Sequence, residues 1–109
     1  MLLTKIDEYE VMYSANVNAP RIWLKSSNKY IGQLIFNPNG SALPPDIVVN
    51  DQVYLYYHLD DYHNIIDLLR NEQPMYLLYI GTGSGNENGI KTTTETVGEG
   101  HHVFSNNVS

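Results

Sequence analysis

Hydrophobic and polar residues alternate in short runs along most of this chain. Alternation places every second side chain on one face of an extended backbone, which predicts half-buried strands. Prolines, glycines and asparagines separate the runs, as is typical of turns. Residues 1–8 lack the pattern and are interpreted as a lead-in. The predicted strands are residues 9–13, 21–25, 30–36, 53–58, 75–80 and 90–97, and the β-branched run 47–49 allows one more.

One segment, from about Asp61 to Asn71, repeats at helical spacing instead. Asp60 or Asp61 is the expected N-cap, because a carboxylate there accepts hydrogen bonds from unpaired backbone amides. Pro74 prevents the helix from continuing. Positions i, i+3, i+4 and i+7 form one apolar stripe, which we expect to be buried: Tyr62, Ile65, Ile66 and Leu69.

A single helix framed by strands predicts an α+β fold. We expect a five- to six-stranded, mainly antiparallel sheet, curved or partly closed, with the helix between the fourth and fifth main strands. An OB-like barrel, which also inserts a helix before its last strands, is the alternative. Gly32 inside a strand indicates a bulge or a close backbone approach. The 109-residue length predicts a single domain over residues 1–100, and the patternless residues 101–109 predict a disordered tail.

Composition narrows the classes of function. The chain has no cysteine, which excludes a disulfide framework, cysteine-ligated zinc and thiol catalysis. It has no run of about 18 apolar residues and no hydrophobic signal region near residue 1, so we expect no membrane association and a cytoplasmic location. The formal charge of −6 disfavours nucleic acid and anionic membranes as partners.

His58, Asp60, Asp61 and His63 form the densest group of potential metal ligands. Asp60 and His63 are three residues apart and share a helix face, so a metal-dependent hydrolase built on His58, Asp60 and His63 is one hypothesis. Metal sites usually draw ligands from several elements, and no second group stands out in the sequence. The favoured interpretation is that the aspartates cap the helix and that no metal or other cofactor is bound.

The glycine-rich run 81–85 resembles a phosphate loop only in composition. A phosphate loop leads from a strand into a helix, whose first amides hold the anion. Here the β-branched run 90–97 follows, so the loop is expected to connect a hairpin. No arrangement of nucleophile, base and orienting group is visible either, and no catalytic residue is assigned. An enzymatic function therefore lacks support.

A second candidate site is a basic and aromatic strand. Arg21, Trp23 and Lys25 share one face because strand side chains repeat every second residue. A tryptophan between two cations suits a binder of single-stranded nucleic acid or of another anionic ligand. The alternative is a solvated face on which lysine stems shield the tryptophan.

The nine tyrosines suggest a third candidate site. Tyr54 and Tyr56 share a strand face with His58, and one helix cannot cover both faces of a sheet. An uncovered face rich in tyrosine suits protein recognition, because tyrosine gives a large contact area at low entropic cost. The leading hypothesis is a non-enzymatic interaction module that self-associates or binds a protein partner. Tyrosines lining the edge of the core are the alternative.

The segments Leu55–Tyr57, Leu68–Pro74 and Thr94–Glu99 carry a further indication. In these segments, and loosely over residues 20–99, the chain resembles a family of small single-domain bacterial proteins of unknown function. The resemblance implies a bacterial cytoplasmic protein and attaches no activity to it. It also implies a natural end near Gly100.

Overall fold

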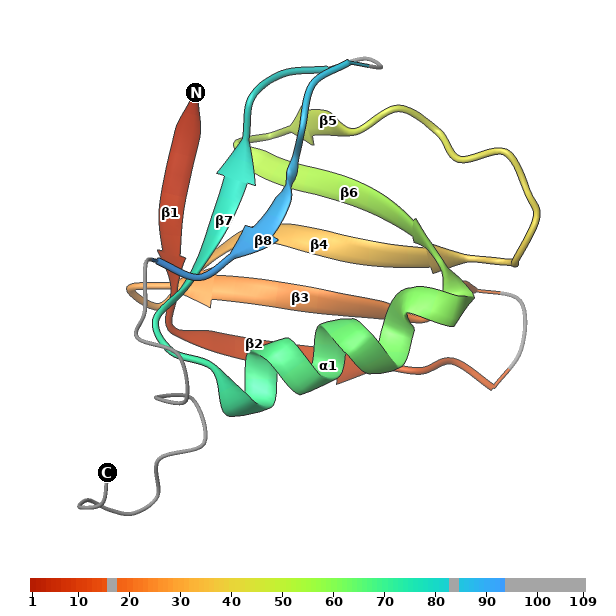
Figure 1. Ribbon diagram of the computed structural model, residues 1–109, viewed down its shortest axis with the longest axis horizontal. Helices are drawn as coiled ribbons and strands as arrows, with labels where there is room; N and C mark the ends of the chain where they lie inside the picture. Colours follow the sequence, from red (N-terminus) through yellow and green to blue (C-terminus); the bar gives the residue numbers. More distant parts are fainter. Residues whose placement is uncertain (16–17, 83–84, 94–109) are drawn as a thin grey trace.

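The computed structural model describes residues 1–15, 18–82 and 85–93, which form an α+β fold (Figure 1). The predicted tail 101–109 and the end of the predicted strand 90–97 lie outside these ranges. In chain order the described elements are β1 (Leu2–Ile6), β2 (Glu8–Met12), β3 (Arg21–Ser26), β4 (Lys29–Asn37), β5 (Ile47–Val49), β6 (Gln52–His58), the 3-10 turn η1 (Leu59–Asp61), α1 (Tyr62–Asn71), β7 (Met75–Tyr79) and β8 (Gly89–Lys91).

The strands form two open sheets, whereas the sequence predicts one curved or partly closed sheet, with an OB-like barrel as the alternative. A five-stranded sheet has the order β2-β3-β4-β6-β5, and a three-stranded sheet has the order β1-β7-β8. Among the described strands, β4 and β6 are the one parallel pair, and all other pairs are antiparallel. The lead-in interpretation of residues 1–8 is wrong, because Leu2–Ile6 pairs along its whole length with β7.

Two tight hairpins set the order of the larger sheet. Ser27 and Asn28 connect β3 to β4, and Asn50 and Asp51 connect β5 to β6, all with positive φ. Two consecutive residues of positive φ suit the right-handed twist of the flanking strands, and Asn and Asp tolerate that conformation. The longer segment before β5 carries the chain back so that β6 runs parallel to β4.

The core lies between the two sheets and the helix. Along β3, β4 and β6, every second residue is buried, which gives the larger sheet an inner face. The helix and the smaller sheet cover this face (Figure 1). The inner-face residues exposed by no more than 3% are Ile22, Leu24, Leu34, Phe36, Val53 and Leu55, and they pack in one cluster with Ile65, Met75 and Leu77.

The helix lies where the sequence places it, but its start is held differently. Ile65 is buried, while Ile66 and Leu69 are half-buried against the core. Neither Asp60 nor Asp61 caps the helix through its carboxylate. Asp61 has backbone angles near the helical region (φ −84°, ψ −7°), whereas a capping residue is usually extended.

A polar link joins the two sheets at the end opposite the helix. The carboxylate of Asp46 accepts one hydrogen bond from the Tyr56 amide at 3.1 Å and another from Asn88 Nδ2 at 3.0 Å. Asn88 also accepts the Ile80 amide at 2.6 Å through Oδ1. The loop after β7 is therefore tied to the segment that precedes β5.

Candidate interaction face and groove

The outer face of the larger sheet unites two groups of residues that the sequence treats as separate candidates. Arg21, Trp23 and Lys25 alternate along β3 with the buried Ile22 and Leu24, so they point away from the core. Each is half-buried, as expected for side chains on a single-layer sheet face flanked by neighbouring strands. The predicted common face of these three residues is confirmed.

The strand register brings the tyrosines onto the same face. Trp23 lies opposite Gln33 on β4, and Gln33 lies opposite Tyr54 on β6. Directly paired residues project to the same side of a sheet, so Trp23 and Tyr54 share the outer face.

A second row, next to the first, follows the same rule. Arg21 lies opposite Ile35, and Ile35 lies opposite Tyr56. The two predicted sites, one basic and aromatic and the other tyrosine-rich, are therefore neighbouring parts of one surface. We define the outer face as Arg21, Trp23, Lys25, Gln33, Ile35, Ile47, Tyr54 and Tyr56.

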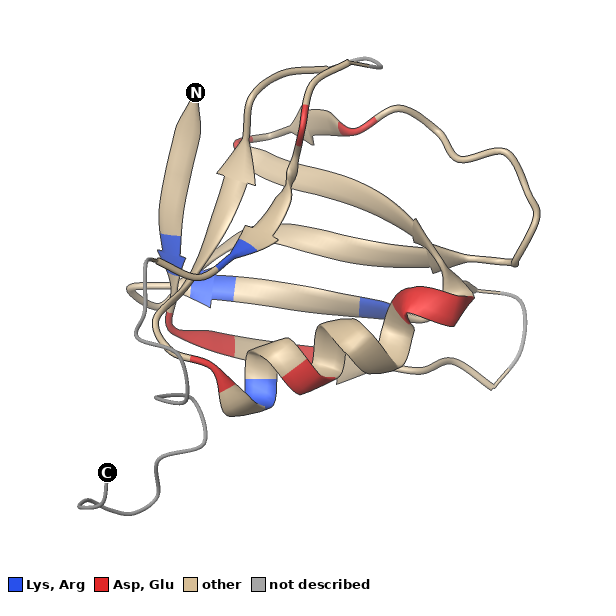
Figure 2. Cartoon of the chain, viewed as in Figure 1, with Lys and Arg blue, Asp and Glu red and all other residues tan. Residues whose placement is uncertain are grey.

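The outer face is charged at one side and uncharged at the other. The acidic residues of β2 and the basic residues of β3 lie on neighbouring strands at one edge of the larger sheet (Figure 2). The strands β5 and β6 carry no Lys, Arg, Asp or Glu. Ile47 pairs with Tyr54 and is 39% exposed, so the uncharged side ends in accessible apolar surface.

The cations of the outer face are already engaged. The guanidinium carbon of Arg21 lies 5.2 Å from the centre of the Trp23 ring, and Lys25 Nζ lies 5.2 Å from that of Tyr30. Lys25 Nζ is also 3.8 Å from a carboxylate oxygen of Glu8. Because the cations already interact with aromatic rings and a carboxylate, less of their positive charge is free to pair with an incoming phosphate.

Glu10 lies opposite Trp23 on β2 and adds negative charge to this side. Its carboxylate accepts a hydrogen bond of 2.9 Å from the Tyr30 hydroxyl, and this bond is the main reason that the pKa of Tyr30 is raised. Burial and the negative charge of Glu10 raise it further. The electrostatic character of the surface beside Trp23 is therefore mixed rather than basic.

The residues proposed for a metal site are directed to other partners. His58 Nε2 lies 2.7 Å from the Ser41 carbonyl oxygen, and the Asp60 carboxylate accepts a bond from Asn39 Nδ2. The His63 ring packs against the Tyr62 ring. Within residues 1–15, 18–82 and 85–93, no three His, Asp or Glu side chains are placed to share an ion. The absence of a cofactor stays a prediction.

The glycine-rich loop connects two strands. It joins β7 to β8 in an antiparallel hairpin with Leu78 opposite Gly89. The hydroxyls of Tyr79 and Thr82 are hydrogen-bonded where the loop begins. Since a strand and not a helix follows, the loop lacks the helix N-terminus on which a phosphate site depends.

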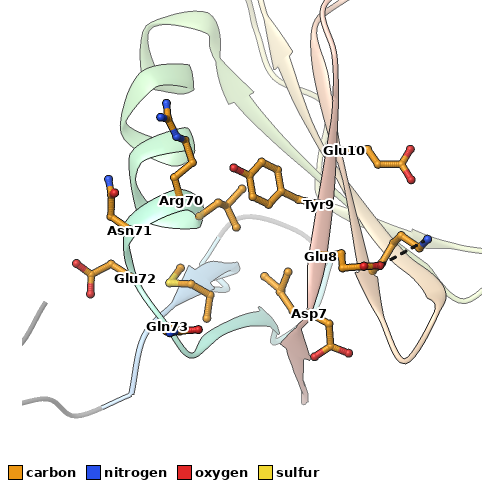
Figure 3. A pocket seen from close by; sticks show the side chains of 12 residues that line it. Asp7, Glu8, Tyr9, Glu10, Arg70, Asn71, Glu72 and Gln73 are labelled. Carbon is orange, nitrogen blue, oxygen red and sulfur yellow. Dashed lines mark ion pairs between the residues drawn. The ribbon is translucent and has the colours of Figure 1, made fainter. Parts of the chain in front are cut away.

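A groove between β2 and the end of α1 is a site that the sequence analysis does not identify. It has a volume of about 660 Å³ and opens to solvent (Figure 3). Tyr9 points into it from β2, and Leu69 lines it from α1. The alternation of Glu8, Tyr9 and Glu10 is a signal for an edge strand, but the helix that forms the second wall is distant in sequence. Its lining residues are Ile6–Glu10, Lys25, Leu69–Gln73 and Met75.

In the described part of the chain, no helix is long and apolar enough to span a membrane. Comparison with known proteins gives no relative: no family model matches the chain, and neither a curated protein nor a solved structure matches it. The resemblance to small bacterial proteins therefore stays a prediction.

Proposed function

We propose that the protein is a non-enzymatic interaction module that self-associates through the outer face of its larger sheet. The observation that carries the proposal is the register Trp23–Gln33–Tyr54, which gathers large aromatic side chains on the face that points away from the core. Aromatic residues of this kind are enriched at protein interfaces and supply most of their binding energy.

The distribution of charge favours a second copy of the chain as the partner. A two-fold interface needs a surface that is complementary to itself. The outer face meets this condition, because its charged side carries both signs, in Lys25 and the neighbouring Glu8 and Glu10. Its uncharged side, around Tyr54 and Ile47, can pack against the same region of the second copy.

Light scattering over a concentration series tests the proposal. We expect the mass to rise from 12.4 kDa toward twice that value with concentration. Tyr54→Ser removes an aromatic ring from the face and should shift the midpoint to a concentration about tenfold higher. Tyr76→Ser is the matched control, since Tyr76 is a half-buried strand tyrosine of the smaller sheet. A constant monomer mass at high micromolar concentration would remove the proposal.

A second candidate function uses the same face. Arg21, Trp23 and Lys25 lie together on it, which is the arrangement that binds single-stranded nucleic acid on other sheets. Trp23 is the one tryptophan of the chain, so its fluorescence reports this face directly. Saturable quenching by an oligonucleotide, weakened by salt and lost in Arg21→Gln, would favour this function if the protein stays monomeric.

A further inference from the structure

The strand β2 has a free edge that faces the groove. It pairs with β3 on one side, and no described strand pairs with its other side. Alternate backbone amides and carbonyls of such a strand point outward without a partner, so an extended peptide can add to the sheet there. The wall opposite this edge is formed by Leu69–Gln73, at the end of α1 (Figure 3).

The pleat of β2 determines what an added strand would meet. Tyr9 lies opposite Leu24, whose side chain is buried, so Tyr9 belongs to the inner side and points into the groove (Figure 3). Leu69 also lines the groove, and both side chains pack against the core. Glu8 and Glu10 project to the outer side. A residue opposite Tyr9 would therefore enter apolar surroundings, and residues opposite Glu8 and Glu10 would lie beside carboxylates.

The charge around the groove is mainly negative. Four acidic residues line it, against Lys25 and Arg70, and Lys25 is already paired with Glu8. Pairing of β2 with β2 of a second copy would place Glu10 opposite Glu10, or Glu8 opposite Glu10, and like charges directly opposite destabilise a sheet. A basic segment has the charge that this edge lacks. The four acidic residues are Asp7, Glu8, Glu10 and Glu72.

We propose that the edge of β2 binds an extended segment of another protein in which basic and apolar residues alternate. The segment adds a sixth strand to the larger sheet. Its apolar residues pack toward Tyr9 and Leu69, and its Lys or Arg residues pair with Glu8 and Glu10. This site adjoins the charged side of the outer face, because Lys25 lines the groove as well and Glu8 and Glu10 project to the outer side. The backbone edge of β2 is not part of the outer face, and the proposal does not depend on self-association.

The probe is a fluorescent, end-capped peptide of sequence KVKVK, measured by anisotropy at low salt. We expect saturable binding, about tenfold tighter than that of the control peptide KKKVV. This control has the same composition but groups its lysines and valines, and only the alternating sequence matches the pleat of the strand. A KVKVK peptide with N-methylated backbone amides should lose about tenfold in affinity as well, since it cannot donate to a strand edge.

Protein variants locate the site. The double variant Glu8→Gln, Glu10→Gln should weaken binding of KVKVK by about threefold to tenfold and reduce its dependence on salt. The matched control is Asp67→Asn, Glu87→Gln, which removes two exposed acidic charges outside the groove and should leave affinity unchanged.

Amide chemical shifts complete the test. Addition of KVKVK should move the signals of 7–11 and 69–73, and leave the Trp23 indole signal unchanged. The proposal would be overturned if KVKVK did not bind saturably, or if KKKVV or the N-methylated peptide bound equally well. It would also be overturned if the two double variants had equal effects, or if the chemical-shift changes were centred on the outer face.

Discussion

Asn39 and Asp60 form two hydrogen bonds with each other across 21 positions of sequence. The Asp60 amide donates to Asn39 Oδ1 at 2.8 Å, and Asn39 Nδ2 donates to the Asp60 carboxylate at 2.9 Å. Asn39 lies in the loop after β4, and Asp60 lies in the turn that starts the helical segment. The unpaired amide that an N-cap would normally satisfy is therefore satisfied by a side chain from a different element.

Replacing Asn39 by Ala should lower the free energy of unfolding by about 1 kcal/mol, the typical cost of losing a capping group. Asn64→Ala is the control, because Asn64 is exposed within α1 and Ala favours helices. Chemical denaturation of both variants is the measurement. An unchanged stability of Asn39→Ala would show that the reciprocal pair contributes nothing.

Gly32 on β4 lies opposite Val53 on β6, where the two backbones leave no room for a side chain. A Cβ at this position would be 2.5 Å from the Val53 carbonyl oxygen and 3.3 Å from a Leu77 methyl group. The register on β3 also shifts here, since Leu24 pairs with Gly32 and Lys25 pairs with Tyr30. Of the two features that the sequence offers as alternatives, a bulge or a close backbone approach, the close approach is confirmed.

We expect Gly32→Ala to destabilise the protein by about 3 kcal/mol, because the backbone of β6 must move to admit the methyl group. Gly40→Ala is the comparison: Gly40 has a φ of +82° but open space around it. Its cost should be limited to backbone strain, about 1 kcal/mol. Thermal or denaturant unfolding measures both, and equal losses would refute the steric explanation.

Local pattern predicts the elements of this fold better than their assembly. The helix is found almost at its predicted bounds because its apolar stripe and Pro74 depend on neighbouring residues alone. The division into two sheets depends on Leu2–Ile6 pairing with β7, about seventy positions later. Nothing in the weak pattern of that segment identifies its partner.

The outer face is likewise predicted in its parts but not in its assembly. Alternation predicts that Arg21 and Trp23 share a face, and that Tyr54 and Tyr56 do. The two faces form one surface only because β4 pairs with β6 in parallel. This pairing requires the chain to return between the two strands, which alternation alone does not predict. The groove is also invisible in the sequence, because its two walls are brought together only by packing of the helix.

Ile65 and Ile66 are adjacent on the predicted apolar stripe, but the structure separates their contributions. Ile65 is 6% exposed inside the core cluster, whereas Ile66 is half-buried at its margin. Ile65→Ala should therefore cost about 2–4 kcal/mol through a cavity that the core cannot refill. Ile66→Ala should cost clearly less, because Ile66 is already partly open to solvent, which can occupy the space. Equal losses in denaturant unfolding would contradict this ranking.

Tyr57 makes stability depend on pH in the alkaline range. Its ring stacks on Phe36 with the ring centres 5.8 Å apart, and burial raises the pKa of its hydroxyl to about 12, assisted by the negative charges of Asp46 and Asp61. An unfolded tyrosine has a pKa of about 10. The folded state therefore holds this proton more tightly than the unfolded state does.

The direction in which stability changes with pH follows from that difference in pKa. The contribution of Tyr57 is complete below pH 10 and is lost as the pH rises toward 12. A difference of two pKa units corresponds to a loss of about 2–3 kcal/mol. Tyr57→Phe keeps the ring and removes the ionisable hydroxyl, so its stability should fall less between pH 9 and pH 12 than that of the unsubstituted protein. Denaturant unfolding at a series of pH values measures both curves. Parallel curves would show that ionisation of Tyr57 does not limit alkaline stability.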